Sequence, residues 1–232
     1  MILPFLSAGE QADPNDFPPP HRALTEPNGL LAVGGDLSLS RMMAAYQRGI
    51  FPWFGVGDPI LWWCPDPRTV FTPDQFHLSQ SLKKWRRQSR YRITVNHAFA
   101  EVVAGCAAPR AEQDGTWIVP EMFAVFLALH QAGFGYSVEV WDKNQLVGGL
   151  VGAKFGRVAF GESMFSRAPN ASKFALAAIL VDNCWGTLDF MDCQFTTRHL
   201  LSLGAQEWSR SYFLHRLSIS FQPRDLATPT NN

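Results

Sequence analysis

The sequence predicts a mixed fold, of the α+β or α/β class, in which a small, loop-rich N-terminal part precedes a larger domain. Strand and helix patterns alternate after residue 65, and three consecutive strand patterns are typical of antiparallel neighbours. Before that point, prolines and glycines interrupt the chain too often for long regular elements. With 232 residues, of which 47% are hydrophobic and 17% charged, the chain can bury a sizeable core.

The N-terminal part combines loop signals with one clear helix. Residues 1–30 carry closely spaced prolines, which suit neither a helix nor a strand ladder. The first expected helix follows Asp36-Leu37-Ser38, where Asp36 and Ser38 offer side chains that suit an N-cap, and it ends at Gly49. Aromatic residues crowd among the prolines and glycines of 49–68, so we expect loops to carry them, as walls of a site or as interdomain packing. A domain boundary near Pro65 divides the chain into a small N-terminal domain, 1–65, and a second domain, 66–232.

In the second domain the expected elements follow one another closely. Helices are predicted at 79–87, 96–104, 120–133, 172–184, 197–203 and 212–217, and strands at 91–95, 136–141, 145–151, 157–165 and 188–195. Asn96 is the expected cap of the second of these helices, and the tail, 225–232, is expected to be disordered.

Composition and missing motifs exclude several classes of protein. Twenty Lys and Arg balance twenty Asp and Glu, so no global charge points to nucleic acid. The four cysteines form no CxxC pair and have no histidines at zinc-ligand spacing, which predicts reduced thiols in a cytoplasmic protein without a metal. The longest apolar runs fall far short of the ~20 residues that span a bilayer, and the N-terminus lacks the pattern of a signal peptide. Neither GxxxxGK[ST] nor GxGxxG occurs, and 166–171 lacks the glycine that a coenzyme A site at this junction would need, so no cofactor is expected.

Two polar residues stand out in the strand predicted at 188–195. Side chains alternate along a strand, which places Asp192 and Gln194 on one face, ~7 Å apart. A carboxylate and an amide among apolar residues are costly to bury without a partner or a chemical role. Catalysis is one explanation, and an ion pair or cap of Asp192 with Arg198 or Lys173 is the other.

The same question arises for Glu162 in the strand predicted at 157–165. Alternation places Phe160 and Met164 on its face, and buried structural pairing again competes with a catalytic role. Cys193 is a weaker candidate for a nucleophile, because it points away from the Asp192 face and a buried cysteine usually acts as a small hydrophobic residue.

Residues 83–92 hold six positive charges, and no acidic residue occurs between Gln75 and Ala100. Such a run suits a phosphate backbone, although a solvated helix face would also explain it. The interleaved Trp85 and Tyr91 favour nucleic acid with unpaired bases, which stack on such rings at ~1–3 kcal/mol each. The cations of this run that we expect to contact phosphates are Lys83, Lys84, Arg86 and Arg87.

Nine stretches, in order between about residues 17 and 217, resemble the leucyl/phenylalanyl-tRNA–protein transferase family. They are 26–37 (EPNGLLAVGGDL), 46–54 (YQRGIFPWF), 62–68 (WWCPDPR), 115–118 (GTWI), 147–150 (VGGL), 161–166 (GESMFS), 170–173 (NASK), 192–194 (DCQ) and 199–205 (HLLSLGA). The sequence departs from the family pattern mildly, at Cys64, Val119 and Val151. Of these, Val151 alters one wall of the pocket that the resemblance implies for the aminoacyl group.

The resemblance implies an α+β fold, with a small N-terminal domain followed by an N-acetyltransferase-like (GNAT-type) domain with a mixed, mainly antiparallel sheet. It implies transfer of leucine, less readily phenylalanine and weakly methionine, from aminoacyl-tRNA to the N-terminal Arg or Lys of a protein. The product is a peptide bond and a bacterial-type N-terminal degradation signal. We expect a monomer whose partners are aminoacyl-tRNA and such proteins, with no membrane contact.

The resemblance also implies roles for individual residues. By position, Trp53 and Trp117 correspond to the family's clamp for the terminal adenosine of tRNA, and Asp192 and Gln194 to its catalytic pair, with Glu162 as a supporting acid. The apolar pocket for the aminoacyl side chain corresponds to Leu150, Met164, Ile179 and Met191.

These residue types suit the implied chemistry. Aminoacyl-tRNA is an activated ester, so an amide forms from it without ATP. A carboxylate is a poor base for the free α-ammonium group, whose pKa is ~8. It can hydrogen-bond the attacking amine and accept the more acidic proton of the tetrahedral intermediate, the role expected of Asp192, while Gln194 orients the amine. An acetyl-coenzyme A N-acyltransferase and a noncatalytic RNA-binding module are the rival classes.

Overall fold

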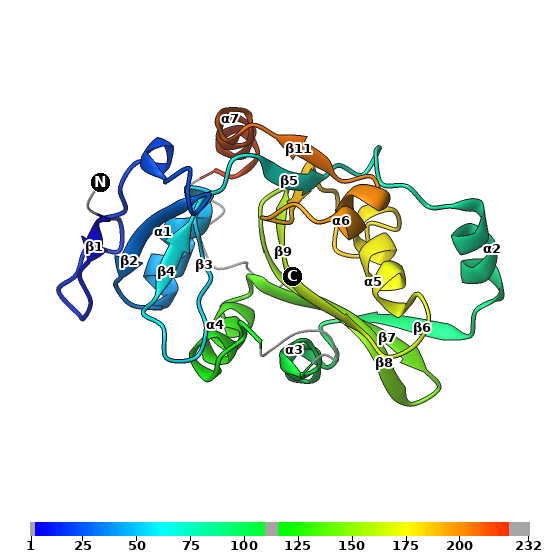
Figure 1. Cartoon of the computed structure of the whole chain (residues 1–232). Helices are drawn as coiled ribbons and strands as arrows, with labels where there is room; N and C mark the ends of the chain where they lie inside the picture. Colours follow the sequence, from blue (N-terminus) through cyan, green and yellow to red (C-terminus); the bar gives the residue numbers. More distant parts are fainter. Residues whose placement is uncertain (1–2, 110–115, 223–232) are drawn as a thin grey trace.

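The computed structural model describes residues 3–109 and 116–222 and contains two β-sheets (Figure 1). The N-terminal sheet has the strand order β1-β2-β4-β3, with β1 (Phe5–Leu6), β2 (Leu30–Gly34), β3 (Phe51–Pro52) and β4 (Leu61–Trp63). The 3-10 helix Pro20–Arg22 precedes β2, and helix α1 (Leu39–Gln47) follows it. Of the two candidate N-cap residues, Ser38 caps α1, because its side chain accepts a hydrogen bond from the Arg41 amide.

The prediction that loops carry the aromatic residues of 49–68 is wrong for several of them. Phe51 lies in β3, and Trp62 and Trp63 lie in β4. Antiparallel pairing of β4 with both β2 and β3 satisfies the backbone between the prolines. Trp62 is fully buried, and its Nε1 donates a hydrogen bond to the Gly34 carbonyl at 2.9 Å.

The larger sheet has seven strands and is mixed. In sheet order they are β11 (Gln206–Trp208), β5 (Arg68–Phe71), β10 (Phe190–Asp192), β9 (Val158–Ser166), β8 (Gln145–Phe155), β7 (Gly135–Asp142) and β6 (Tyr91–Val95). Strands β9 and β10 are parallel, and every other neighbouring pair is antiparallel. This arrangement confirms the expected α+β fold with a mainly antiparallel sheet.

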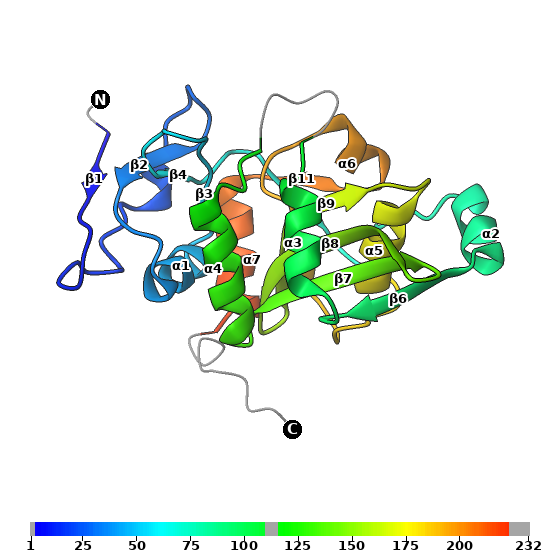
Figure 2. The ribbon, with the colours of Figure 1, turned by 90° about the horizontal axis from the view of Figure 1, so that it is seen from below.

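Helices cover both faces of this sheet (Figure 2). The helices of this part of the chain are α2 (Gln80–Gln88), α3 (Phe99–Ala107), α4 (Pro120–Gln131), α5 (Ala171–Leu180), α6 (Arg198–Ser202) and α7 (Arg210–Ser220). Helices α3 and α4 pack on one face of β7 and β8, and α5 packs on the other. Within the described residues, no helix is long and apolar enough to cross a membrane.

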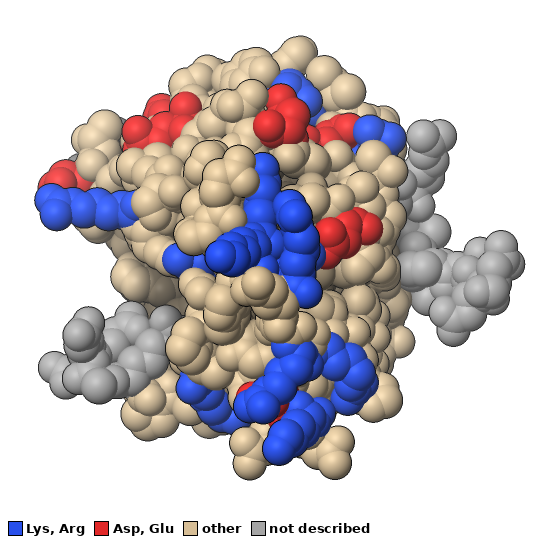
Figure 3. Space-filling view, turned by 90° about the vertical axis from the view of Figure 1, so that its right-hand side faces the viewer, with Lys and Arg blue, Asp and Glu red and all other residues tan. Residues whose placement is uncertain are grey.

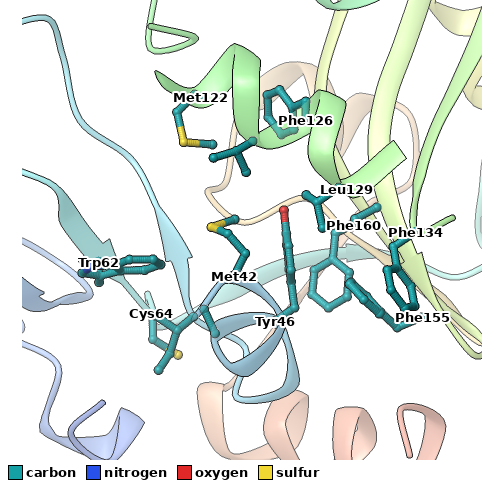
Figure 4. Close-up of a cluster of buried hydrophobic side chains, with 14 of the residues drawn as sticks. Met42, Tyr46, Trp62, Cys64, Met122, Phe126, Leu129, Phe134, Phe155 and Phe160 are labelled. Carbon is teal, nitrogen blue, oxygen red and sulfur yellow. The ribbon is translucent and has the colours of Figure 1, made fainter. Parts of the chain in front are cut away.

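The hydrophobic cluster on the α3 and α4 face extends into the N-terminal part (Figure 4). Met42 and Tyr46 of α1 reach toward Met122 of α4, and the Tyr46 ring lies 4.7 Å from that of Phe160 in β9. The same cluster includes Trp62 of β4. The two sheets therefore share a core. The chain passes from one sheet to the other between β4 and β5, where the boundary near Pro65 is predicted.

Several predicted elements differ in extent from the observed ones. Helix α3 begins at Phe99, not beside Asn96, because Asn96 adopts a φ of 57° and its side chain accepts a hydrogen bond from the Ser137 amide. The helix predicted at 172–184 ends at Leu180, and the strand predicted at 188–195 shrinks to Phe190–Asp192. The tail predicted to be disordered, 225–232, lies outside the described residues.

Candidate active site

Two adjoining hollows lie beside β9 and β10, and the second of them also borders β3 of the N-terminal sheet. The first is a cavity of about 340 Å³ with an apolar wall. The second, of about 190 Å³, is lined by aromatic residues that include Phe51, Trp53 and Phe195. Glu162 and Gln194 line both hollows, so two polar side chains lie at the junction of an apolar and an aromatic compartment. We call the first hollow the apolar cavity and the second the aromatic hollow.

Three of the four residues expected in the acyl pocket line the apolar cavity. Leu150, Met164 and Met191 contribute to its wall, whereas Ile179 does not. Ile179 is 3% exposed in α5 and borders a separate small space beside Trp185. Leu176, nearly one helical turn earlier in α5, lines the cavity instead.

Both predicted clamp residues line the aromatic hollow. The Trp53 side chain is 44% exposed and packs edge-on against Trp63 at 5.6 Å and at an inclined angle against Phe195 at 5.4 Å. Trp117 lines both hollows and rests on Phe126 of α4 at 5.9 Å. The two indoles are thus held from behind by other rings while they border open space.

Asp192 lies behind the cavity wall. Its carboxylate is fully buried, and Oδ1 and Oδ2 accept hydrogen bonds from Nε and Nη2 of Arg68 at 2.7 and 2.6 Å. The partner is therefore Arg68, not Arg198 or Lys173. The sequence did not indicate this partner because the two residues are 124 positions apart, although Arg68 belongs to the family-like WWCPDPR stretch.

Gln194 follows the end of β10, so the prediction that it shares a strand face with Asp192 is wrong. Its φ is 57°, a left-handed conformation that breaks the alternation of side chains. Asp192 Oδ1 accepts a hydrogen bond from the backbone amide of Gln194 at 3.0 Å, and the backbone carbonyl of Gln194 accepts one from the backbone amide of Thr69 at 3.0 Å. These bonds turn the Gln194 side chain into the cavity. The carbonyls of Cys193 and Gly161, each 3.1 Å from the end of this side chain, assign its nitrogen to their side, because the nitrogen can donate a hydrogen bond to both.

Glu162 occupies a β-bulge. Val151 pairs with Ser163 and Gly152 with Gly161, which leaves Glu162 as the extra residue of β9. A side chain at position 152 would place its Cβ 2.0 Å from the Phe160 carbonyl oxygen, so this close approach requires glycine. The bulge reverses the alternation of β9.

The reversal corrects one prediction. Phe160 belongs to the core on the α3 and α4 face, and Met164 packs against the core on the α5 face, so they do not share a face. Tyr46 donates a hydrogen bond from Oη to Glu162 Oε1 at 2.9 Å. Burial nevertheless raises the pKa of Glu162 from 4.5 to about 7. Glu162 can therefore exchange a proton near neutral pH.

Cys193 lines both hollows beside Gln194. Burial raises the pKa of its thiol far above the ordinary value, and the neighbouring Asp192 adds to this effect. A thiol that stays protonated is a poor nucleophile, so the site gives no support to a cysteine mechanism. Among the described residues, no three His, Cys, Asp or Glu side chains are grouped to hold a metal ion.

Comparison with known proteins decides the family. The family model described as "Leucyl/phenylalanyl-tRNA protein transferase" matches residues 70–218, and that of its N-terminal domain matches residues 35–66. The chain belongs to the leucyl/phenylalanyl-tRNA–protein transferase family. It is therefore an aminoacyltransferase, which moves an aminoacyl group from tRNA to a protein.

Curated relatives and solved structures are similar to the transferase to different degrees. The leucyl/phenylalanyl-tRNA–protein transferase of Pseudomonas fluorescens (strain SBW25) is 55% identical over 204 residues, which are 88% of this chain and 90% of that protein. The one from Cellvibrio japonicus is 52% identical over 226 residues, 97% of this chain and 94% of that protein. A GCN5-related N-acetyltransferase from Kribbella flavida aligns with 72% of this chain and 60% of its own, at 13% identity and a TM-score of 0.36.

The transferase carries the predicted basic residues on α2, at one end of the molecule (Figure 3). Lys83, Lys84 and Arg87 are exposed. Arg86 is tied to the protein, because it forms an ion pair with Asp182 and its central carbon lies 5.7 Å from the Phe174 ring centre. Figure 3 shows basic side chains gathered in two groups on this end of the molecule.

The two aromatic residues of the basic segment have a structural role. The Trp85 ring packs edge-on against Tyr91 at 5.3 Å and against Phe174 at 5.3 Å. Both rings are half-buried. They anchor α2 to the sheet and to α5, which leaves the lysines and Arg87 as the groups of α2 that can reach a phosphate.

Proposed function

We propose that the transferase moves leucine, less readily phenylalanine and weakly methionine, from aminoacyl-tRNA to the N-terminal Arg or Lys of a protein. The observation that supports this most is the junction of the two hollows at Glu162 and Gln194. The terminal adenosine would stack between Trp53 and Trp117, and the aminoacyl side chain would fill the apolar cavity. The ester that joins these two parts then lies beside Glu162 and Gln194.

The apolar cavity fits an unbranched-at-Cβ aliphatic side chain. Leu150, Leu176 and the two methionines, Met164 and Met191, offer it no charged group. Flexible methionines adapt to different shapes, which would admit phenylalanine and methionine as poorer substrates. A misfit of one methyl group costs only ~1–3 kcal/mol, so discrimination is graded rather than absolute.

In the proposed reaction, the α-amine of the acceptor attacks the ester carbonyl. A bond forms between the amine nitrogen and the carbonyl carbon, and the bond to the ribose oxygen breaks, which returns a hydroxyl to the tRNA. The Gln194 amide oxygen would accept a hydrogen bond from the amine and orient it, since the amide nitrogen is directed to two backbone carbonyls. The proton lost by the nitrogen ends on the ribose oxygen.

The geometry divides the work of the two acids differently from the sequence-based expectation. Asp192 does not border either hollow, and Arg68 occupies both of its oxygens. We therefore assign Asp192 the positioning of Gln194. Glu162, whose pKa of about 7 suits proton exchange at neutral pH, is the group that would take the proton of the intermediate.

The proposed partners follow from the rest of the surface. Lys83, Lys84 and Arg87 would contact the acceptor-stem phosphates without reading sequence. We further propose that the transferase acts in the cytoplasm as a monomer, without a cofactor, and gives its products an N-terminal degradation signal.

The test is the transfer of labelled leucine from leucyl-tRNA to two peptides that differ only in their first residue, Arg or Ala. Label on the Arg peptide alone is the expected result. Label on both peptides would contradict the acceptor rule, and label on neither, with tRNA still bound, would contradict the proposed reaction. Calorimetry with coenzyme A tests whether the protein binds the rival acyl donor, and we expect no binding.

A further inference from the structure

Arg68, at the start of β5, is a fully enclosed cation with three polar attachments. It is 1% exposed. Nε and Nη2 donate to Asp192 at 2.7 and 2.6 Å, and Nη1 donates to the Gly49 carbonyl at 2.9 Å. The ring centres of Phe51 and Phe213 lie 4.8 and 4.6 Å from its central carbon. One guanidinium thus joins β10, the segment between α1 and β3, and α7.

On one side, these contacts lead to the catalytic amide. The Asp192 Oδ1 that accepts from Arg68 also accepts the backbone amide of Gln194 at 3.0 Å. That bond helps to hold Gln194 at its φ of 57° and so sets where its side chain points. Arg68 fixes the carboxylate with two parallel bonds, a geometry that a lysine cannot reproduce.

On the other side, the contacts lead to the adenosine clamp. Phe51 lies two residues before Trp53, and both rings pack against Phe195, at 5.5 and 5.4 Å. Phe195 directly follows Gln194 in the chain. The contacts close a ring that runs from Arg68 through Asp192, Gln194 and Phe195 to the Trp53 segment and back to Arg68.

A buried ion pair adds little net stability over apolar residues of the same shape, so stability alone does not explain this one. Its directional bonds do specify position. We propose that Arg68 is a positioning residue that couples the Trp53 segment to Gln194, so that binding of the adenosine end of aminoacyl-tRNA sets the orientation of the catalytic amide. The proposal rests on the proposed function, in which adenosine binds at Trp53.

A double-mutant cycle on the affinity for leucyl-tRNA tests the coupling. It compares the wild type, Trp53→Ala, Arg68→Lys and the double variant. Coupled residues are not additive, so we expect Trp53→Ala to weaken binding by at least about fivefold less in the Arg68→Lys background than alone. In single-turnover transfer at saturating leucyl-tRNA, Arg68→Lys should lower the rate by about tenfold or more. Because the enzyme is already saturated, a higher concentration of leucyl-tRNA should not restore this loss.

Arg41→Lys is the matched control. Arg41 is also fully buried and pairs with Asp16 at 2.5 Å and Asp36 at 3.4 Å, but its contacts lie in the N-terminal part and touch neither hollow. It should lower the melting temperature and leave the effect of Trp53→Ala unchanged. Coupling of the same size in this control would mean that general destabilisation produces the effect, and would overturn the proposal.

Phe195→Leu gives a second route if Arg68→Lys fails to fold. Phe195 is half-buried and belongs to the same ring of contacts, so its combination with Trp53→Ala should also be non-additive. Independent, multiplicative effects of both pairs on affinity would overturn the proposal. The affinity cycle does not depend on transfer: a wild type that binds leucyl-tRNA but transfers no leucine to the Arg peptide would refute the proposed function and still report the coupling.

Discussion

Replacing Glu162 with glutamine should change how the stability of the transferase depends on pH. Burial raises the pKa of Glu162 from 4.5 to about 7, because the folded protein disfavours its charged form. The glutamine retains an oxygen that can accept the Tyr46 hydrogen bond now made at 2.9 Å. The substitution therefore removes the titration with little change of shape.

The sign and size follow from linkage. Below pH 4.5 the carboxyl is protonated in both the folded and the unfolded chain, so titration causes no loss of stability. As the pH rises from 4.5 to about 7, the unfolded chain ionises first, and the wild type loses up to ~1.4 kcal/mol per pH unit relative to the variant. Between pH 4.5 and about 7, the difference in the free energy of unfolding between Glu162→Gln and the wild type should therefore change in favour of the variant by on the order of 3 kcal/mol. Above pH 7 this difference should stay constant.

Urea denaturation at half-unit steps between pH 4.5 and 8.5 measures this difference directly. Glu121→Gln, on the exposed first turn of α4, serves as the control for the loss of a surface carboxylate and should show no gain of this size between pH 4.5 and 7. A difference between Glu162→Gln and the wild type that does not change with pH would refute the reasoning, since it would mean that Glu162 titrates alike in the folded and unfolded chains.

Three further variants probe the proposed site. Asp192→Asn leaves Arg68 buried without its counter-charge, so it should lower the free energy of unfolding by ~3–5 kcal/mol and slow transfer more than it weakens tRNA binding; wild-type turnover would remove Asp192 from the mechanism. The double variant Lys83→Ala, Lys84→Ala should weaken tRNA binding. It should also make the slope of log affinity against log salt concentration less steep, by up to about one per lost phosphate contact. Unchanged affinity would mean that this helix face is merely solvated. Leu150→Ala should enlarge the apolar cavity and reduce discrimination among aminoacyl groups by about tenfold, measured as a ratio of transfer rates, whereas unchanged discrimination would place the pocket elsewhere.

Local patterns predicted most of the helices and the long strands. The bounds of β6 match the prediction, α4 begins at Pro120 as expected, and Ser38 caps α1. These features depend on residues near one another in the chain, namely a cap, a proline at a helix start or an alternating run. The short strands β5 and β11 left no such signal, because each has only three or four residues and forms by pairing with distant segments.

The parts of the site that the sequence did not show depend on backbone irregularities and distant partners. The left-handed conformation of Gln194 and the bulge at Glu162 each break the strand alternation used to place these side chains. The partner of Asp192 is Arg68 of β5, which lies 124 positions away in the sequence and becomes a neighbour only when β5 pairs with β10 in the folded sheet. The family resemblance, by contrast, named residues at both hollows, although Ile179 is not among those that line the apolar cavity.

The central claim is that the apolar cavity selects the amino acid that is presented to Gln194. The most direct measurement is transfer to an Arg peptide from leucyl-, phenylalanyl-, methionyl- and valyl-tRNA, each well below saturation, so that the rates compare kcat/KM. The account predicts that leucine is transferred fastest, that phenylalanine and methionine follow, and that valine, which is branched at Cβ, is at least about tenfold slower than leucine. Valine transfer at a rate close to that of leucine would contradict it.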